Sequence, residues 1–128
     1  MRHLILVAAL LALMPLTASA EFHTYSMERI YTACRGALRD VSRDAPIQEM
    51  SDAMRNGAEC AGYIAGFIAA IESGGTDDRR LAACLGRTEL ARIMRVLVRY
   101  LDEHPKAAAL DGGIAMRMVL SESYGCAK

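Results

Sequence analysis

The chain has 128 residues, a length that suits one domain with a single hydrophobic core. Lys and Arg together number 15, and so do Asp and Glu, so the formal net charge at pH 7 is zero. General nucleic-acid and membrane-surface binding proteins carry a basic excess, and the neutral balance argues against that class. We therefore expect no nucleic-acid partner.

Residues 1–20 have the three parts of a secretory signal peptide. A basic start at Arg2 is followed by an apolar run over residues 4–14, and residues 18–20 (Ala-Ser-Ala) match a small-residue cleavage site. Cleavage there would leave residues 21–128 as one exported domain. No second apolar run approaches the ~20 residues that a membrane-spanning helix needs. We therefore expect a periplasmic protein without membrane insertion after cleavage.

The first helix of the domain is predicted from Met27 to Val41. Apolar residues recur there at helical spacing, Ser26 is placed to cap the helix, and Cys34 falls on the inward stripe. Pro46 then interrupts the pattern. In the helix that follows, we expect Met54 to face inward.

A long second helix is expected from Ile47 to Ser73, with a kink or interruption at Asn56-Gly57. Its segment from Cys60 to Ile71 contains no charged residue, and a helix that is apolar on all sides belongs in the middle of a bundle. Gly62 and Gly66 share one face, and each costs about 1 kcal/mol relative to Ala. We therefore expect another helix to approach closely there, within the bundle or, alternatively, across a dimer seam.

The most polar run of the chain, residues 76–80, follows this helix. It is predicted to be a solvated loop or a short helical turn, and its functional interpretation is a projecting loop that contacts a partner. The candidate residues are Asp77, Asp78, Arg79 and Arg80.

A further helix is predicted with Thr88 as its cap, and it ends at the His104-Pro105 pair, where the residue before proline resists helical angles. Its apolar stripe consists of Leu90, Ile93, Met94, Leu97, Val98 and Leu101. Three arginines fall on another face, where they form either a binding surface for an acidic partner or simply a row exposed to solvent. These candidates are Arg92, Arg95 and Arg99. Glu89, Asp102 and Glu103 are close enough along the helix to pair with them.

The remainder of the chain is predicted to be helical too. His104 is expected to cap the preceding helix, residues 105–110 to form a short helical turn, and Asp111 to cap a last helix that ends near Gly125. The inward residues expected there are Ile114, Ala115, Met118 and Val119. With no alternating strand pattern, the sequence predicts an all-α fold, a small disulfide-stapled bundle of about four main helices.

Four cysteines lie in the mature domain: Cys34, Cys60, Cys84 and Cys126. An even number in a small exported domain predicts two disulfides rather than a zinc site. If the helices that follow Cys84 and precede Cys126 run antiparallel, those two cysteines meet. The preferred pairing is therefore Cys34 with Cys60 and Cys84 with Cys126. The pairing of Cys60 with Cys84 and of Cys34 with Cys126 remains open.

No catalytic motif is evident. The mature chain has two histidines, His23 and His104, far apart in the sequence, and no nucleophile-elbow, zinc-protease or phosphate-binding signature. We therefore expect a protein that is not an enzyme and needs no cofactor or metal. A binder, an inhibitor or a structural subunit fits these observations better.

Several motifs, in order, resemble the Rap/Tai immunity protein family, whose members resist amidase toxins delivered by type VI secretion. The motifs are Cys34, Cys60-Ala-Gly-Tyr63-Ile-Ala-Gly66, Cys84, Tyr100-Leu-Asp-Glu-His-Pro105 and Tyr124-Gly-Cys126. They span nearly all of the mature chain. Because they consist of cysteines, glycines, core aromatics and a helix-ending proline, they concern the scaffold more than the contact surface.

The resemblance implies a periplasmic helical protein, often a homodimer, that binds a cell-wall amidase effector and blocks its active site without catalysis. Such a protein protects the producing cell from its own toxin. The alternative is a general periplasmic helical binding protein or chaperone-like envelope protein with the same scaffold. One tight partner is expected from the first interpretation, and several loose partners from the second.

Overall fold

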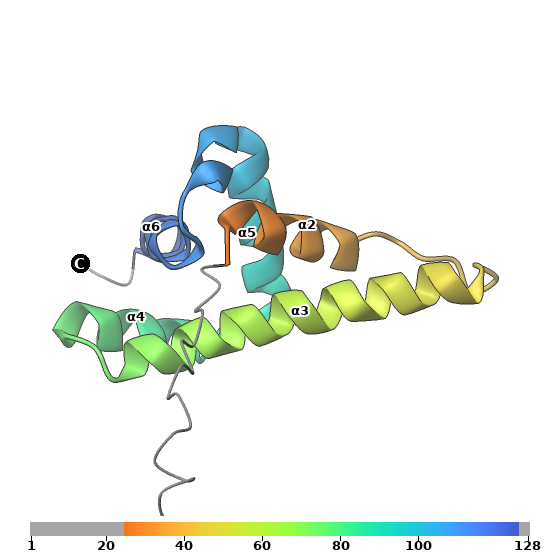
Figure 1. Ribbon diagram of the computed structural model, residues 1–128. Coiled ribbons are helices and arrows are strands. Elements are labelled where there is room, and N and C mark those ends of the chain that lie inside the picture. The colour runs from red at the N-terminus through yellow and green to blue at the C-terminus, as the bar shows by residue number, and fades with distance from the viewer. Residues whose placement is uncertain (1–24, 126–128) are drawn as a thin grey trace, which may run out of the picture.

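The computed structural model describes residues 25–125, and in that range the chain forms five α-helices and one 3-10 helix, without a strand. These elements are α2 (Met27–Ala37), α3 (Ile47–Glu72), α4 (Thr76–Leu85), α5 (Leu90–Glu103), η1 (Pro105–Ala109) and α6 (Gly112–Tyr124) (Figure 1). The predicted all-α fold is confirmed, with one α-helix more than the four expected. The predicted signal peptide lies outside the described residues.

The longest helix, α3, is the platform on which α2 and α4 pack (Figure 1). Its 26 residues continue through Asn56 and Gly57, so the long helix is confirmed and is not interrupted there. Gly36 of α2 faces Asn56 so closely that a Cβ at position 36 would lie 2.4 Å from the Asn56 side-chain nitrogen. This contact between α2 and α3 supports the helix where Gly57 weakens it. The N-terminal end of α3 extends beyond the other helices.

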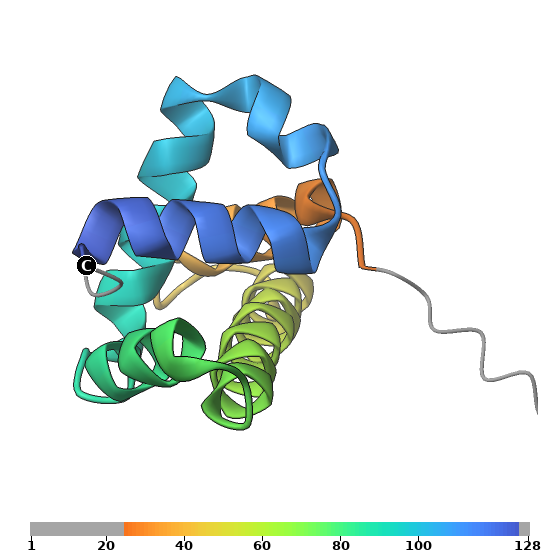
Figure 2. The same ribbon diagram turned by 90° about the vertical axis from the view of Figure 1, so that its left-hand side faces the viewer.

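The core is formed by buried residues of all five α-helices, including α4. Seen along α3, the helix α6 lies above both α3 and α4 (Figure 2). The largest fully buried side chains include Met27, Ile30, Ile64, Leu97, Met116 and Leu120. Each such side chain stabilises the fold by about 1.5–3 kcal/mol relative to an exposed position. This packing fixes the position of α5, which carries the arginine row.

The N-termini of α2 and α6 lie side by side. The amide of Met27 donates to the carbonyl of Leu110 at 3.2 Å, and the amide of Gly112 donates to the carbonyl of Tyr25 at 3.0 Å. Two predicted N-caps are confirmed: Ser26 accepts from the amide of Arg29, and the Asp111 carboxylate accepts from the amides of residues 113 and 114. The predicted Thr88 cap is wrong, because α5 begins after Glu89 and the Thr88 hydroxyl donates to the Cys84 carbonyl oxygen instead. Two helix starts are thus held together by backbone hydrogen bonds.

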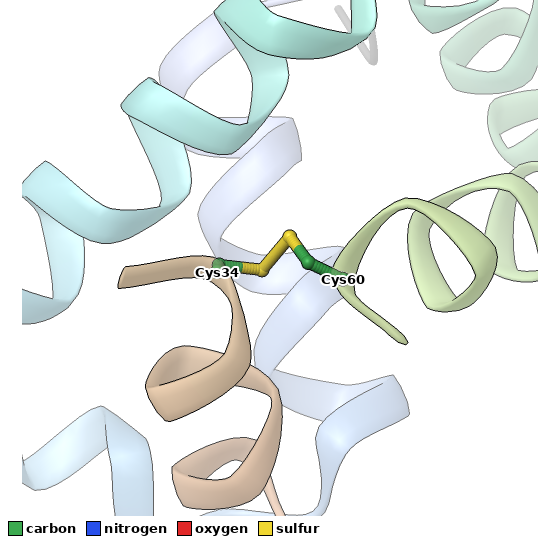
Figure 3. Close-up of a disulfide and its surroundings, with 2 residues drawn as sticks. All are labelled: Cys34 and Cys60. Atoms are coloured by element: carbon green, nitrogen blue, oxygen red, sulfur yellow. A yellow bond between two sulfur atoms is a disulfide. The ribbon is translucent and has the colours of Figure 1, made fainter. Parts of the chain in front are cut away.

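A disulfide joins α2 to α3, as Figure 3 shows. It links Cys34 and Cys60, whose Cα atoms are 4.9 Å apart and whose side chains are both fully buried. The first half of the preferred pairing is therefore confirmed, and the alternative pairing is wrong. The second predicted pair, Cys84 with Cys126, includes a residue outside the described range and stays a prediction.

Three expectations about buried faces and helix ends are wrong. Met54, expected inward, is 76% exposed, because it lies near the end of α3 that extends beyond its neighbours. In α6, Ala115 and Val119 are buried as expected, but Ile114 is 64% exposed and Met118 is 38% exposed. Met116 and Leu120 take their place, since α6 is rotated so that a neighbouring apolar stripe faces the core. The first helix ends at Ala37, four residues before Val41.

Candidate partner-binding surface

The first sequence candidate, residues 76–80, is the beginning of helix α4 and not a projecting loop. Asp77 and Asp78 occupy the first turn, where negative charge is favoured by the helix dipole. Arg80 forms an ion pair with Asp77, one turn earlier, with the two charged atoms 3.8 Å apart. The polar composition that suggested a loop therefore reflects the solvent-facing start of a ten-residue helix.

The other two charges of this segment also have partners within the protein. Asp78 forms an ion pair with Arg117 of α6, and its side chain is only 21% exposed. Arg79 donates to the carbonyl oxygen of Gly74 at 2.8 Å. The Asp78–Arg117 pair fastens α4 to α6, so a partner that uses Asp78 would have to break an internal contact. No sequence signal connected Arg117 to this segment.

The second sequence candidate, the row of Arg92, Arg95 and Arg99, lies on the exposed side of α5. This helix turns its apolar stripe inward and fully buries Ile93 and Leu97, so the arginines on the opposite face point to solvent. The three arginines line, together with Val96, a surface hollow of about 420 Å³. The structure therefore brings all three predicted residues together in one depression.

The intrahelical ion pairs expected for these arginines do not form. Among residues 25–125, no ion pair involves any of the three. Asp102, expected to pair with Arg99, instead accepts a hydrogen bond from the Tyr31 hydroxyl of α2. That hydrogen bond raises the pKa of Tyr31. Asp102 thus links α5 to α2 and does not pair with Arg99.

At the C-terminal end of α5, the arginine row adjoins a group of side chains that contact one another. Arg99 also lines a second hollow of about 270 Å³ beside Tyr100 and His104. The Tyr100 hydroxyl donates to Glu122 at 2.8 Å, which raises the pKa of Tyr100. The His104 ring stacks on Tyr100, and its Nδ1 lies 3.0 Å from the Tyr100 carbonyl oxygen. His104 therefore caps the helix as predicted.

Tyr124 of α6 is affected by the charges of the arginine row on α5. Partial burial raises the pKa of Tyr124, while the positive charges of Arg92 and Arg99 lower it. The row therefore adjoins α6, whose Glu122 and Ser123 line the second hollow together with Arg99.

A third surface, on α3, was not expected to be open. Only Cys60, Ile64 and Ile71 of the uncharged segment are buried, and a Cβ built at Gly62 or Gly66 meets nothing within 4 Å. The expected close approach of another helix within the bundle is therefore wrong at both glycines. The exposed residues of this face are Ala58, Gly62, Ala65, Gly66 and Ala69. Small side chains expose little apolar area, which makes an uncovered helix face tolerable.

Replacing Gly62 and Gly66 together by alanine is expected to raise the free energy of unfolding of the monomer by about 1–2 kcal/mol. Alanine restricts the unfolded chain and favours the helix, and both new methyl groups have open space. Chemical denaturation of the oxidised protein at low concentration checks this result. A loss of stability would mean that another element covers this face.

Comparison with known proteins gives one match. The family model described as Rap1a immunity proteins matches residues 26–126. No curated protein and no solved structure matches the chain.

Proposed function

Because the chain belongs to the Rap1a immunity protein family, we propose that it binds a type VI effector, specifically an amidase that cleaves peptidoglycan, and blocks its active site without catalysis. The single observation that carries this proposal is the family match, which spans almost the whole helical domain. The motifs that first suggested the resemblance lie within the matched residues, including the Cys60–Gly66 segment of α3 and the Tyr100–Pro105 end of α5.

The location we propose is the periplasm, where peptidoglycan is exposed to such an effector. The Cys34–Cys60 disulfide supports this location, because disulfides persist in oxidising compartments outside the cytoplasm. The proposal includes export by a signal peptide at residues 1–20. Within residues 25–125, no helix combines the length and the hydrophobicity needed to cross a bilayer.

The chemistry of the described residues supports inhibition by binding. Cys34 and Cys60 are joined and fully buried, so neither serves as a nucleophile. His104 has a structural role at the end of α5, where its Nδ1 lies beside the Tyr100 carbonyl oxygen and its ring stacks on the Tyr100 ring. A disulfide-linked helical scaffold also holds its surface in a fixed conformation, which lowers the entropic cost of tight association.

The proposal is tested with the purified mature protein and a cell-wall amidase that it retains from the secreted fraction of the producing strain. We expect a one-to-one complex with a dissociation constant in the nanomolar range or below, equivalent to about −12 kcal/mol. Peptidoglycan hydrolysis by the amidase should stop at an equimolar amount of the protein. Binding without inhibition would contradict occlusion of the active site. Weak binding to several unrelated envelope proteins would favour the general periplasmic binding function instead.

The proposal also includes self-association into a homodimer, which the resemblance implies. The glycine substitutions on α3 help to locate the seam. If the uncovered face of α3 is the dimer contact, the two added methyl groups weaken the dimer while they stabilise the monomer. An unchanged dimer would place the contact elsewhere.

A further inference from the structure

We propose that the row formed by Arg92, Arg95 and Arg99 is the docking site for an acidic segment of the effector protein, whose carboxylates enter the hollow between these arginines. This inference rests on the proposed function, since it assigns a surface to the partner that an immunity protein binds. It selects one of the two charged surfaces that the sequence singled out.

The two charged surfaces differ in whether their charges are already paired within the protein. At the start of α4, Asp77 pairs with Arg80, Asp78 pairs with Arg117, and Arg79 donates to a carbonyl oxygen. A partner binding there would compete with existing contacts. The arginine row forms no ion pair within residues 25–125. A partner carboxylate therefore gains a charge-assisted hydrogen bond without displacing an internal one.

The three arginines of the row are spaced along one side of α5 and surround a hollow. Arg92 and Arg99 are seven residues apart on one helix, so they span roughly 10 Å along its axis. With Arg95 and the apolar Val96 they surround a hollow of about 420 Å³. Guanidinium groups bind carboxylates through two parallel hydrogen bonds, and their aliphatic stems cover apolar surface. Such a hollow fits two or three acidic side chains on one short segment.

Two carboxylates lie near one end of the arginine row and make the two ends unequal for an acidic segment. Glu103 and Glu122 line the adjoining hollow at the Arg99 end, and Glu122 is already held by the Tyr100 hydroxyl. These carboxylates repel an acidic segment at that end. We therefore expect Arg92 and Arg95 to make the stronger contacts.

The composition of the chain favours a protein partner over a polyphosphate. The formal net charge is zero, and the three arginines occupy only two turns of one helix. Nucleic-acid and anionic-lipid binding depend on many phosphate contacts over a broad basic surface. A short row around a hollow suits a few carboxylates instead.

The test compares two variants that lose the same amount of charge. One is Arg92→Gln with Arg95→Gln and Arg99→Gln. The matched control is Arg39→Gln with Arg43→Gln and Arg87→Gln, which removes three other exposed arginines that form no ion pair within residues 25–125. The dissociation constant for the amidase that the wild-type protein retains is measured for each, at low and high salt, and circular dichroism confirms that both variants fold.

We expect the row variant to bind about 100-fold more weakly or worse, and the control to remain close to the wild-type protein. The wild-type affinity should also fall more steeply with salt than that of the row variant. Equal affinities for the row variant and the wild-type protein would overturn the inference and leave the proposed function intact.

Failure of the amidase to bind would refute the proposed function. A second measurement tests the docking site independently of the amidase. Hexaglutamate peptide is titrated into the isotope-labelled protein, and the arginine Nε–H signals are followed by NMR. Shifts at Arg92 and Arg95 that are absent in the row variant support an acidic-peptide site. Shifts elsewhere, no shifts, or stronger shifts with a short oligonucleotide at the same charge concentration would overturn it.

Discussion

Replacing Cys34 and Cys60 together by alanine is expected to lower the free energy of unfolding by about 3.5 kcal/mol. The disulfide closes a loop of 26 residues, and the chain-entropy model gives about this value for such a loop. The loss is a large fraction of the ~5–15 kcal/mol that stabilises an ordinary domain. Alanine is preferable to serine, because both positions are fully buried and a hydroxyl group there would need a hydrogen-bond partner.

Urea denaturation followed by circular dichroism measures this change. The variant should keep its helical spectrum at low urea concentration and unfold at a much lower midpoint. The oxidised wild-type protein under identical conditions is the control. A loss below about 1 kcal/mol would contradict the prediction. It would mean that contacts between the α2 and α3 segments persist in the unfolded chain and restrain it about as strongly as the disulfide does.

Gly112→Ala is expected to lower the free energy of unfolding by about 2–3 kcal/mol, the cost of overpacking a tight core site. Gly112 is buried at the first position of α6. A Cβ there would lie 2.5 Å from the carbonyl oxygen of Tyr25, 2.6 Å from the Tyr63 hydroxyl and 2.7 Å from Cδ1 of Ile30. One of these atoms belongs to the backbone, so a side-chain rotation alone does not relieve the contact.

The matched control for this prediction is Gly62→Ala, the same chemical change on the open face of α3. The two substitutions should shift the urea midpoint in opposite directions. A neutral result at position 112 would show that the starts of α2 and α6 separate readily. That outcome would also question the hydrogen bond from the Gly112 amide to the Tyr25 carbonyl oxygen as a structural link.

The arrangement of charges bears on how such a protein discriminates between effectors. The ion pair between Asp78 and Arg117 joins α4 to α6, while no ion pair within residues 25–125 involves the arginine row. If the row is the contact surface that we propose, substitutions there are expected to change partner affinity while the disulfide and the core stay the same.

Local features of the sequence determined much of the fold. Ser26 and Asp111 cap their helices, and the His104-Pro105 pair ends α5, because capping and proline geometry depend on a few adjacent residues. The preference for pairing Cys34 with Cys60 followed from the expected meeting of Cys84 and Cys126 at the ends of two antiparallel helices, and the structure contains the Cys34–Cys60 disulfide. The exposure of the three arginines followed from the position of the apolar stripe on their own helix.

Only the tertiary structure decided which of several apolar faces is buried and which charges stay unpaired. On α6, two neighbouring stripes are both apolar, and the packing against α2, α4 and α5 selects Met116 and Leu120 over Ile114 and Met118. The open face at Gly62 depends on how many helices are available to cover α3. Asp102 bonds to Tyr31, 71 residues away, and not to its helical neighbour Arg99. Such choices depend on contacts between distant segments, which local periodicity does not contain.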